Sequence, residues 1–314
     1  MNAPFVISPL TLSIAAVERD TRLSKDTLRV WERRYGFPAP LRDALGERAY
    51  TLEQVEKLRV VKRLLDAGHR PGRIVPMPVE QLQLLAGQTV DQPPPGLEAV
   101  MGSADLRAHM ALIRGHDTPA LRSELMRLLA RHGVLRFVTE VLGPLGTALG
   151  DAWLRGQLEI FEEHAYTETL QTVLRQALAA IPQSERANAP RVLLSTLPGE
   201  QHGVGLLMVE AMLALDGCQC VSLGVQTPVW DIALAARAYR SDIVALSFTA
   251  CIGPNQIIDS LTELRSKLAP TVRLWVGGNA PALQRRPVPG VLAIATLHEL
   301  PVALQRWHQG DPSP

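Results

Sequence analysis

Apolar residues follow two different patterns, one before and one after residue 190. Before it they recur three or four positions apart, as at Leu121, Leu125 and Leu128, which predicts helices packed through one face. After it, short apolar runs alternate with longer amphipathic stretches, which predicts strands alternating with helices. We therefore expect a small helical bundle in the middle of the chain and an α/β domain after it.

The α/β part should follow a doubly wound plan. Its apolar runs lie at 191–197, 218–224, 242–249, 273–278 and 291–296, and its amphipathic stretches at 202–215, 229–240, 255–269 and 297–308. Strands that are apolar throughout need cover on both faces, which is typical of a parallel, Rossmann-like or flavodoxin-like sheet. Ligands of such sheets bind beyond the carboxyl ends of the strands.

Two polar stretches that contain prolines separate the expected domains. They are GQTVDQPPPG at 87–96 and PQSERANAP at 182–190, where prolines stop helices and favour extended backbone. We expect an N-terminal helical module at 10–86, a linker at 87–100, a four-helix cap at 101–182 and the sheet domain at 191–309.

Charge is distributed unevenly along the 314 residues. The net charge is +1, but residues 10–75 hold 14 basic and 9 acidic side chains, a balance of +5, which leaves 18 and 22, or −4, elsewhere. No apolar run has the length of a membrane span, and the N-terminus lacks the features of a signal peptide. Three cysteines without zinc-site spacing predict a reduced, cytoplasmic protein.

The basic N-terminal module has the pattern of helix, tight turn and helix. A helix at 14–20 precedes a second one at 25–34, for which Ser24 is the expected N-cap. This geometry places a second helix in the DNA major groove, and guanidinium groups of a following loop can pair with phosphates. The exposed positions of the second helix are Lys25, Thr27, Arg29 and Arg33, and the loop carries Arg42 and Arg48.

The whole segment 14–74 resembles the MerR-type winged helix-turn-helix, most specifically in TLRVWERRYG, GERAYT and LLDAGH. The resemblance implies binding to double-stranded DNA as a dimer, so a downstream part must oligomerise. By this resemblance the contact residues are Arg29, Arg33 and Arg34 on the recognition helix, with Arg42, Arg48 and Tyr50 around the wing.

A histidine follows the first strand of the sheet domain. His202 lies on a strand-to-helix loop, where a neutral imidazole can ligate a metal while Glu200 orients its other nitrogen. The spacing Glu200-x-His202-x-x-Gly205, then Ser247-Phe248-Thr249, then Gly277-Gly278 resembles the cobalamin-binding signature Asp/Glu-x-His-x-x-Gly, Ser-x-Leu and Gly-Gly.

This second resemblance implies that His202 is the lower axial ligand of cobalt, supported by Glu200. Ser247 and the glycines would line a slot for the dimethylbenzimidazole tail, because small residues let the backbone approach it closely. Thr249 departs from the usual Leu and adds a hydroxyl. A flavodoxin-like domain without a cofactor stays open as an alternative.

The cap carries a third motif. Glu163 and His164 follow Trp153 by ten and eleven residues, which resembles the Trp…Glu-His motif that surrounds the 5′-deoxyadenosyl ligand in CarH photoreceptor repressors. In the best-known members a His follows the Trp and can ligate cobalt after illumination. Leu154 occupies that position here, so a bis-His adduct through this residue is impossible.

The three parts together resemble the CarH/LitR family of light-dependent transcriptional regulators. The resemblance implies a non-enzymatic repressor that binds adenosylcobalamin between cap and sheet. In darkness it would assemble, as a tetramer, on promoter DNA, and light would break the cobalt–carbon bond and release the DNA.

Two other functions are weighed against this one. The first is a corrinoid methyl-carrier protein of an enzyme system, which the DNA-binding module argues against. The second is a regulator of the same layout that senses haem, a bilin, or cobalamin without light. The mass and absorbance of the bound ligand would separate these functions. Operator sequence, target genes and oligomeric state beyond a dimer are not predicted.

Overall fold

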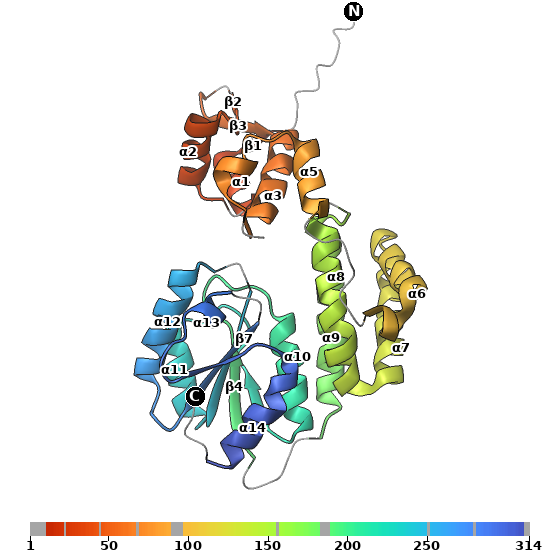
Figure 1. Ribbon diagram of the computed structural model, residues 1–314, viewed down its shortest axis with the longest axis vertical. Coiled ribbons are helices and arrows are strands. Elements are labelled where there is room, and N and C mark those ends of the chain that lie inside the picture. Colours follow the sequence, from red (N-terminus) through yellow and green to blue (C-terminus); the bar gives the residue numbers. More distant parts are fainter. Residues whose placement is uncertain are drawn as a thin grey trace, which may run out of the picture. The chain divides into compact units, whose positions relative to one another are not determined.

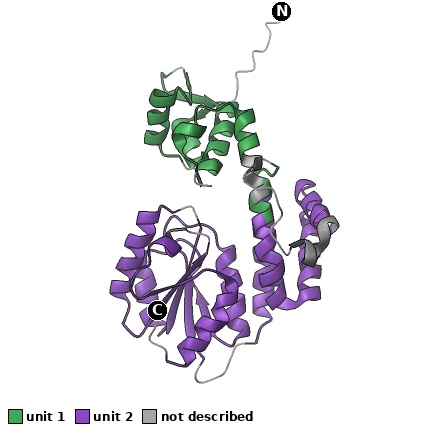
Figure 2. Ribbon diagram, in the orientation of Figure 1, with its two compact units in different colours: residues 1–93, 148–159 green, residues 94–147, 160–314 purple. Residues whose placement is uncertain are grey.

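The computed structural model contains two compact units (Figures 1 and 2). It describes residues 11–21, 23–43, 45–66, 69–88, 97–154, 157–182, 189–249, 252–278 and 281–310. The first unit comprises residues 1–93 and 148–159, and the second comprises residues 94–147 and 160–314.

The N-terminal module of the first unit is a set of helices with a small antiparallel sheet. Ser24 accepts a hydrogen bond from the backbone N–H of Thr27 and Gly36 ends the same helix in a left-handed conformation, as expected for N- and C-caps. The sheet order is β1-β3-β2. The elements are β1 (Thr11–Ser13), α1 (Ile14–Thr21), α2 (Lys25–Tyr35), β2 (Leu41–Arg42), β3 (Arg48–Thr51), α3 (Leu52–Asp66), α4 (Pro71–Ile74) and α5 (Val79–Gln88).

The core of this module lies between α2 and α3. Leu28 and Trp31 of α2 point inward, as the helical pattern predicts, and meet apolar residues of α1, β3 and α3. Tyr50 of β3 belongs to the same core and has no exposed surface. The opposite face of α2 therefore stays exposed to solvent.

The middle of the chain is helical, as predicted. Helices α7 and α9 pack against each other and against α6. Gly133 interrupts α7 with a non-helical φ of 71°, and a π-helical segment follows directly. The elements are α6 (Leu97–Arg114), α7 (Thr118–Arg136), η1 (Phe137–Leu142), α8 (Gly143–Leu154) and α9 (Ile160–Ala179).

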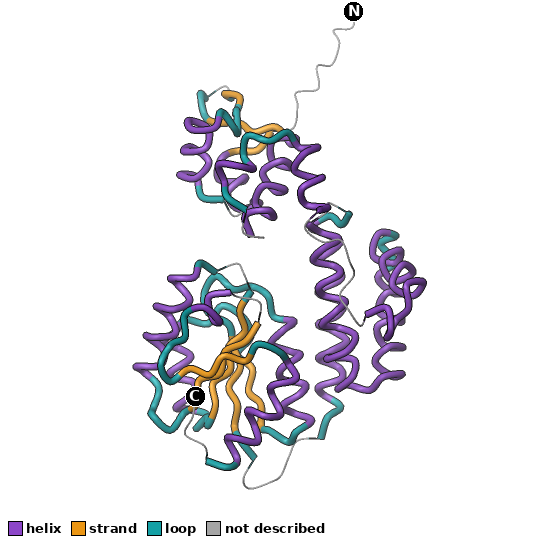
Figure 3. The backbone as a smooth tube through the Cα atoms, viewed as in Figure 1, coloured by secondary structure: helices purple, strands orange, loops and turns teal. Residues whose placement is uncertain are grey.

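The C-terminal part is a parallel sheet of five strands in the order β5-β4-β6-β7-β8. Helices cover both faces (Figures 1 and 3), with α10 and α14 on one side and α11 and α12 on the other. The elements are β4 (Arg191–Ser195), α10 (Val204–Leu215), β5 (Gln219–Ser222), α11 (Val229–Ala238), β6 (Ile243–Phe248), α12 (Pro254–Lys267), β7 (Arg273–Gly278), α13 (Pro281–Arg285), β8 (Val291–Ile294), η2 (Leu297–Glu299) and α14 (Leu300–His308).

This strand order confirms the predicted fold class and fixes where a ligand would bind. The chain leaves β4 toward β5 on one side and continues from β6 toward β7 and β8 on the other. The loops after β4 and β6 therefore diverge and open a crevice at the carboxyl edge between these strands. Helix α10, which starts after the first of these loops, also packs against α9 and α7 of the bundle.

Helices occupy both ends of the stretch that the sequence assigned to the first linker. Helix α5 continues to Gln88, and α6 begins at Leu97, so only residues 89–96 lie between them, outside the described residues. The physical reason is that Leu97, Glu98 and Ala99 follow the last proline and have high helix propensity. Among the described residues no helix has the length and apolar character needed to cross a bilayer.

One histidine inside the bundle makes its stability depend on pH. His109 of α6 is 1% exposed, neither ring nitrogen has a hydrogen-bond partner, and its ring meets Tyr166 edge-on at 5.8 Å between centroids. Burial lowers the pKa of His109 to about 4, although Glu124 opposes the shift. In the unfolded chain the pKa is about 6.5, so the unfolded state binds more protons between these two values.

We predict that the apo-protein loses about 3 kcal/mol of stability as the pH falls from about 6.5 to 4, because protonation favours the unfolded state. His109→Leu should remove most of this dependence. The measurement is the urea midpoint as a function of pH. His308→Gln, at an exposed histidine of α14, is the control, and equal pH dependence in His109→Leu and the control would contradict the prediction.

Candidate functional site

The carboxylate of Glu200 is the centre of the crevice at the carboxyl edge. It is fully buried on the loop after β4. Its Oε1 accepts hydrogen bonds from Nδ1 of His202 at 2.7 Å and from the His202 backbone N–H at 3.1 Å. Its Oε2 accepts from the backbone N–H of Thr249 at 2.6 Å and from the Thr249 hydroxyl at 2.8 Å.

These four hydrogen bonds keep Glu200 ionised. Burial alone would raise the pKa of its carboxyl group, but the hydrogen bonds from His202 and Thr249 outweigh burial and lower it. A carboxylate on Nδ1 fixes the orientation of an imidazole and leaves metal ligation to Nε2. The His202 side chain is 44% exposed, so a ligand can reach it.

Thr249 joins this pair as a third member. Its hydroxyl oxygen lies 3.3 Å from Nδ1 of His202 as well as within hydrogen-bond distance of Glu200. The sequence showed only that a hydroxyl residue replaces the usual Leu. Its contact with Glu200 depends on the parallel pairing of β4 and β6, which brings the ends of the two strands together.

Small residues allow the backbone to approach neighbouring groups closely beside this triad. A Cβ added at Gly205 would lie 3.0 Å from Oγ of Ser247, so the start of α10 and the end of β6 approach closely. Gly278 has a φ of 107°, and a Cβ there would collide with the carbonyl oxygen of Phe248. Ser247 pairs with Gly277 and Phe248 with Gly278 in the sheet register. The structure therefore brings together all the predicted residues of the lower site.

These residues fit a corrinoid. A corrin ring supplies its own equatorial nitrogen ligands, so one oriented imidazole completes what the protein must provide to the metal. The Ser247 hydroxyl, which lies beside Gly205, can donate a hydrogen bond to a nitrogen of the cofactor's tail.

The predicted residues of the cap lie on α8 and α9. Nδ1 of His164 lies 2.7 Å from Oε2 of Glu163, whose Oε1 accepts a hydrogen bond from the Thr167 hydroxyl. The His164 side chain is 67% exposed. Trp153 lies in α8, but its side chain is outside the described part of the chain. The structure thus brings Glu163 and His164 together and leaves Trp153 as a prediction.

A contact between His116 and Glu162, near Glu163, could not be predicted from the sequence. Nε2 of His116, in the turn between α6 and α7, lies 2.9 Å from Oε1 of the buried Glu162, and its ring contacts Phe161. This pair attaches the turn to the first residues of α9 beside Glu163. No spacing in the sequence could show it, because 46 positions separate the two residues.

The recognition helix presents its basic residues as expected. Arg33 and Arg34 are exposed in the last turn of α2. Arg29 is also exposed and pairs weakly with Asp26 at 3.4 Å, a surface contact that phosphate can replace. Lys25 lies 3.6 Å from Glu18 and Thr27 bonds with the Ser24 cap, so both contribute to the start of the helix.

Two predicted DNA contacts in the wing have other roles. Arg48 donates two hydrogen bonds to Glu32, at 2.8 and 3.4 Å, which joins β3 to the recognition helix and raises the Arg48 pKa. Tyr50 has no exposed surface, so it cannot touch DNA in this conformation. Arg42 is exposed and donates to the carbonyl oxygen of Gly46 within the wing.

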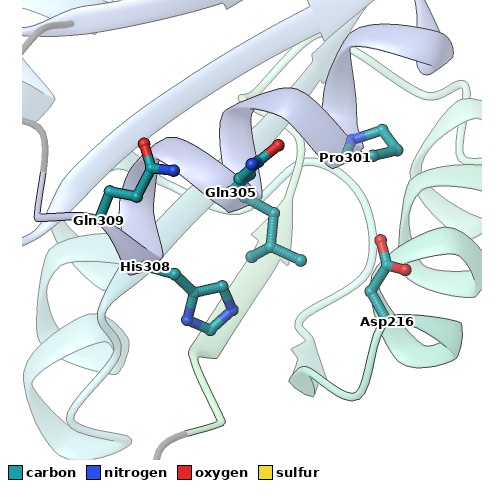
Figure 4. Close-up of a pocket in the computed structure, with 6 residues that line it drawn as sticks. Asp216, Pro301, Gln305, His308 and Gln309 are labelled. Atoms are coloured by element: carbon teal, nitrogen blue, oxygen red, sulfur yellow. The ribbon is translucent and has the colours of Figure 1, made fainter.

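A shallow cavity of about 400 Å³ lies elsewhere, beside α14 (Figure 4). It is lined by Asp216, Pro301, Leu304, Gln305, His308 and Gln309. Asp216 lies between the end of α10 and the start of β5, whereas the triad follows β4 and β6. The cavity therefore lies at the amino edge of the sheet and does not belong to the candidate site.

Each part of the chain matches a known protein family. Residues 12–77 match the MerR HTH family of regulatory proteins, residues 190–296 match the B12 binding domain, and residues 109–177 match a second B12 binding domain family. The carboxyl-edge triad and the basic helix α2 therefore lie in segments that match cobalamin-binding and DNA-binding families.

Similar proteins include two transcriptional repressors and one corrinoid protein. The HTH-type transcriptional repressor CarH of Myxococcus xanthus is 32% identical over 281 residues, covering 86% of this chain and 88% of the relative. CarA of the same organism, also an HTH-type transcriptional repressor, is 29% identical and covers 83% and 84%. The monomethylamine corrinoid protein of Methanosarcina barkeri superposes with a TM-score of 0.51 at 18% identity, over 63% of this chain and 96% of that one.

Removing the Thr249 hydroxyl should destabilise the sheet domain by about 2 kcal/mol, because Glu200 loses a hydrogen bond while its charge stays buried. Thr249→Val keeps the side-chain shape, and Thr249→Ser should recover most of the loss. Urea unfolding measures both. Thr262→Val, which removes a hydroxyl bonded only to its own helix backbone, is the control. A Thr249→Val protein as stable as that control would refute the triad.

The contact between Glu32 and Arg48 should support DNA binding indirectly. Glu32→Gln removes a negative charge, and this change alone strengthens DNA binding. It also weakens the contact with Arg48 that joins the wing to the recognition helix. We expect a loss of about 1 kcal/mol in stability and weaker binding to a random duplex at low salt. Asp26→Asn removes the same charge on the same helix and should bind more tightly. Equal affinities of the two variants would count against the prediction.

Proposed function

The chain belongs to the CarH/LitR family of MerR-type, cobalamin-binding transcription regulators. We propose that it is a repressor that needs adenosylcobalamin to bind promoter DNA and that releases the DNA when it is illuminated. One observation carries the proposal. The triad of Glu200, His202 and Thr249 lies on the same chain as a winged helix with exposed arginines.

The lower face of the cofactor would be held by residues of the carboxyl edge. His202 would ligate cobalt through Nε2 while Glu200 holds Nδ1, and Ser247 would bond the cofactor's tail near Gly205 and Gly278. When bound, adenosylcobalamin supplies a cobalt–carbon bond that visible light breaks. The protein would contribute the orientation of the groups around this bond.

The upper face would meet residues of the cap. Trp153, Glu163 and His164 would surround the adenosyl group, with the indole as an apolar wall and the paired carboxylate and imidazole as hydrogen-bonding groups. Helix α9, which carries Glu163 and His164, packs on α10, and α10 begins two residues after His202. A change at either face is therefore close to the helices that join bundle and sheet.

Repression follows from assembly. A single winged helix makes few contacts, but linked copies bind DNA with a high effective concentration. The cofactor needs only to favour the assembled state by differential affinity, and its loss reverses that preference. In darkness the chain would form at least a dimer, and a tetramer by similarity to the family, with Arg29, Arg33, Arg34 and Arg42 on DNA.

The test is reconstitution with adenosylcobalamin in darkness, followed by size-exclusion chromatography and a DNA mobility shift before and after green light. We expect a large species that retards promoter DNA in the dark and a smaller one with at least about tenfold weaker binding after illumination. His202→Ala should abolish the spectrum of histidine-ligated cobalamin. Identical elution and identical shifts in light and darkness would overturn the proposal.

A further inference from the structure

We propose that Gln226 is a binding residue of the cofactor site, where its side-chain amide hydrogen-bonds the carboxamide rim of the corrin. This inference rests on the proposed function, because it needs a corrinoid above His202. Gln226 lies on the loop between β5 and α11, at the carboxyl edge of the sheet, and its side chain is exposed.

The backbone of Gln226 is held in an unusual conformation. Its φ is 60°, in the left-handed region that residues other than glycine rarely adopt. Its N–H donates to the hydroxyl of Thr196 at 2.8 Å, and the N–H of Thr227 donates to the Thr196 carbonyl at 2.9 Å. Glycine would adopt this φ at a lower conformational free energy than glutamine. The backbone conformation therefore does not explain why a glutamine side chain is present at this position.

The same threonine connects this loop with the His202 loop. The hydroxyl of the fully buried Thr196 donates to the Glu200 carbonyl oxygen at 2.7 Å while it accepts from Gln226. Val225 also reaches the neighbouring loop, since its Cγ1 lies 3.2 Å from where a Cβ of Gly203 would be. Two hydrogen bonds through the Thr196 hydroxyl therefore join the backbone of Gln226 to the backbone of Glu200, two residues before His202.

The chemistry of the corrin matches what this position offers. The ring carries carboxamide side chains around its rim, each with N–H donors and a carbonyl acceptor. A glutamine amide also has both, so the two groups can form paired hydrogen bonds. Because the rim surrounds the metal, a side chain on the loop that adjoins the His202 loop can meet it, whereas the tail would lie near Ser247 and Gly205.

The test compares two corrinoids. Cyanocobalamin has both rim amides and tail, and dicyanocobinamide has the rim amides without the tail. Gln226→Ala should raise the dissociation constant of both by the same factor, about five- to tenfold, as expected for one lost pair of hydrogen bonds. Ser247→Ala should weaken the binding of cyanocobalamin only, because dicyanocobinamide has no tail. Gln305→Ala, at an exposed glutamine of α14, should change neither.

Gln226→Gly separates the side chain from the backbone. It should keep or raise the thermal midpoint of unfolding of the apo-protein, because glycine tolerates this φ. Like Gln226→Ala, it should weaken the binding of both corrinoids. Wild-type affinity in Gln226→Ala, or in Gln226→Gly, would overturn the inference alone. A wild-type protein that binds neither corrinoid would overturn the proposed function and the inference with it.

Discussion

Four hydrogen bonds converge on the buried carboxylate of Glu200, and the geometry of the whole carboxyl edge depends on them. A buried charge without partners costs several kcal/mol, so these donors stabilise the folded domain. Two of the donors belong to His202 and two to Thr249, which lie on loops after different strands. Folding of the sheet therefore fixes the direction of the imidazole before any ligand arrives.

Much of this architecture could be predicted from local patterns. The apolar runs predicted the strands to within a few residues, and Ser24 predicted the start of the recognition helix. Both predictions were possible because caps and hydrophobic periodicity depend on residues close together in the sequence. The lower site could also be predicted, since Glu200 and His202 are two positions apart and the other members follow strand ends.

Features that depend on tertiary packing could not be predicted. The wing sequence suggested contacts for Arg48 and Tyr50, yet Tyr50 completes the core and Arg48 meets Glu32, 16 positions earlier. The break at Gly133 and the π-helical segment after it have no recognisable local pattern. The contacts of Thr249 and Gln226 needed the register of the parallel strands, which sets which loops are neighbours.

The central claim is that the imidazole oriented by Glu200 ligates cobalt. The most direct measurement is the electron paramagnetic resonance spectrum of the protein loaded with cob(II)alamin, after labelling its histidines with nitrogen-15. The unpaired electron lies along the axial direction and couples to the lower ligand's nitrogen. Ligation by His202 predicts that each cobalt line splits into a doublet, and that His202→Ala loses it. A triplet, which reports the cofactor's own unlabelled benzimidazole, would contradict the account.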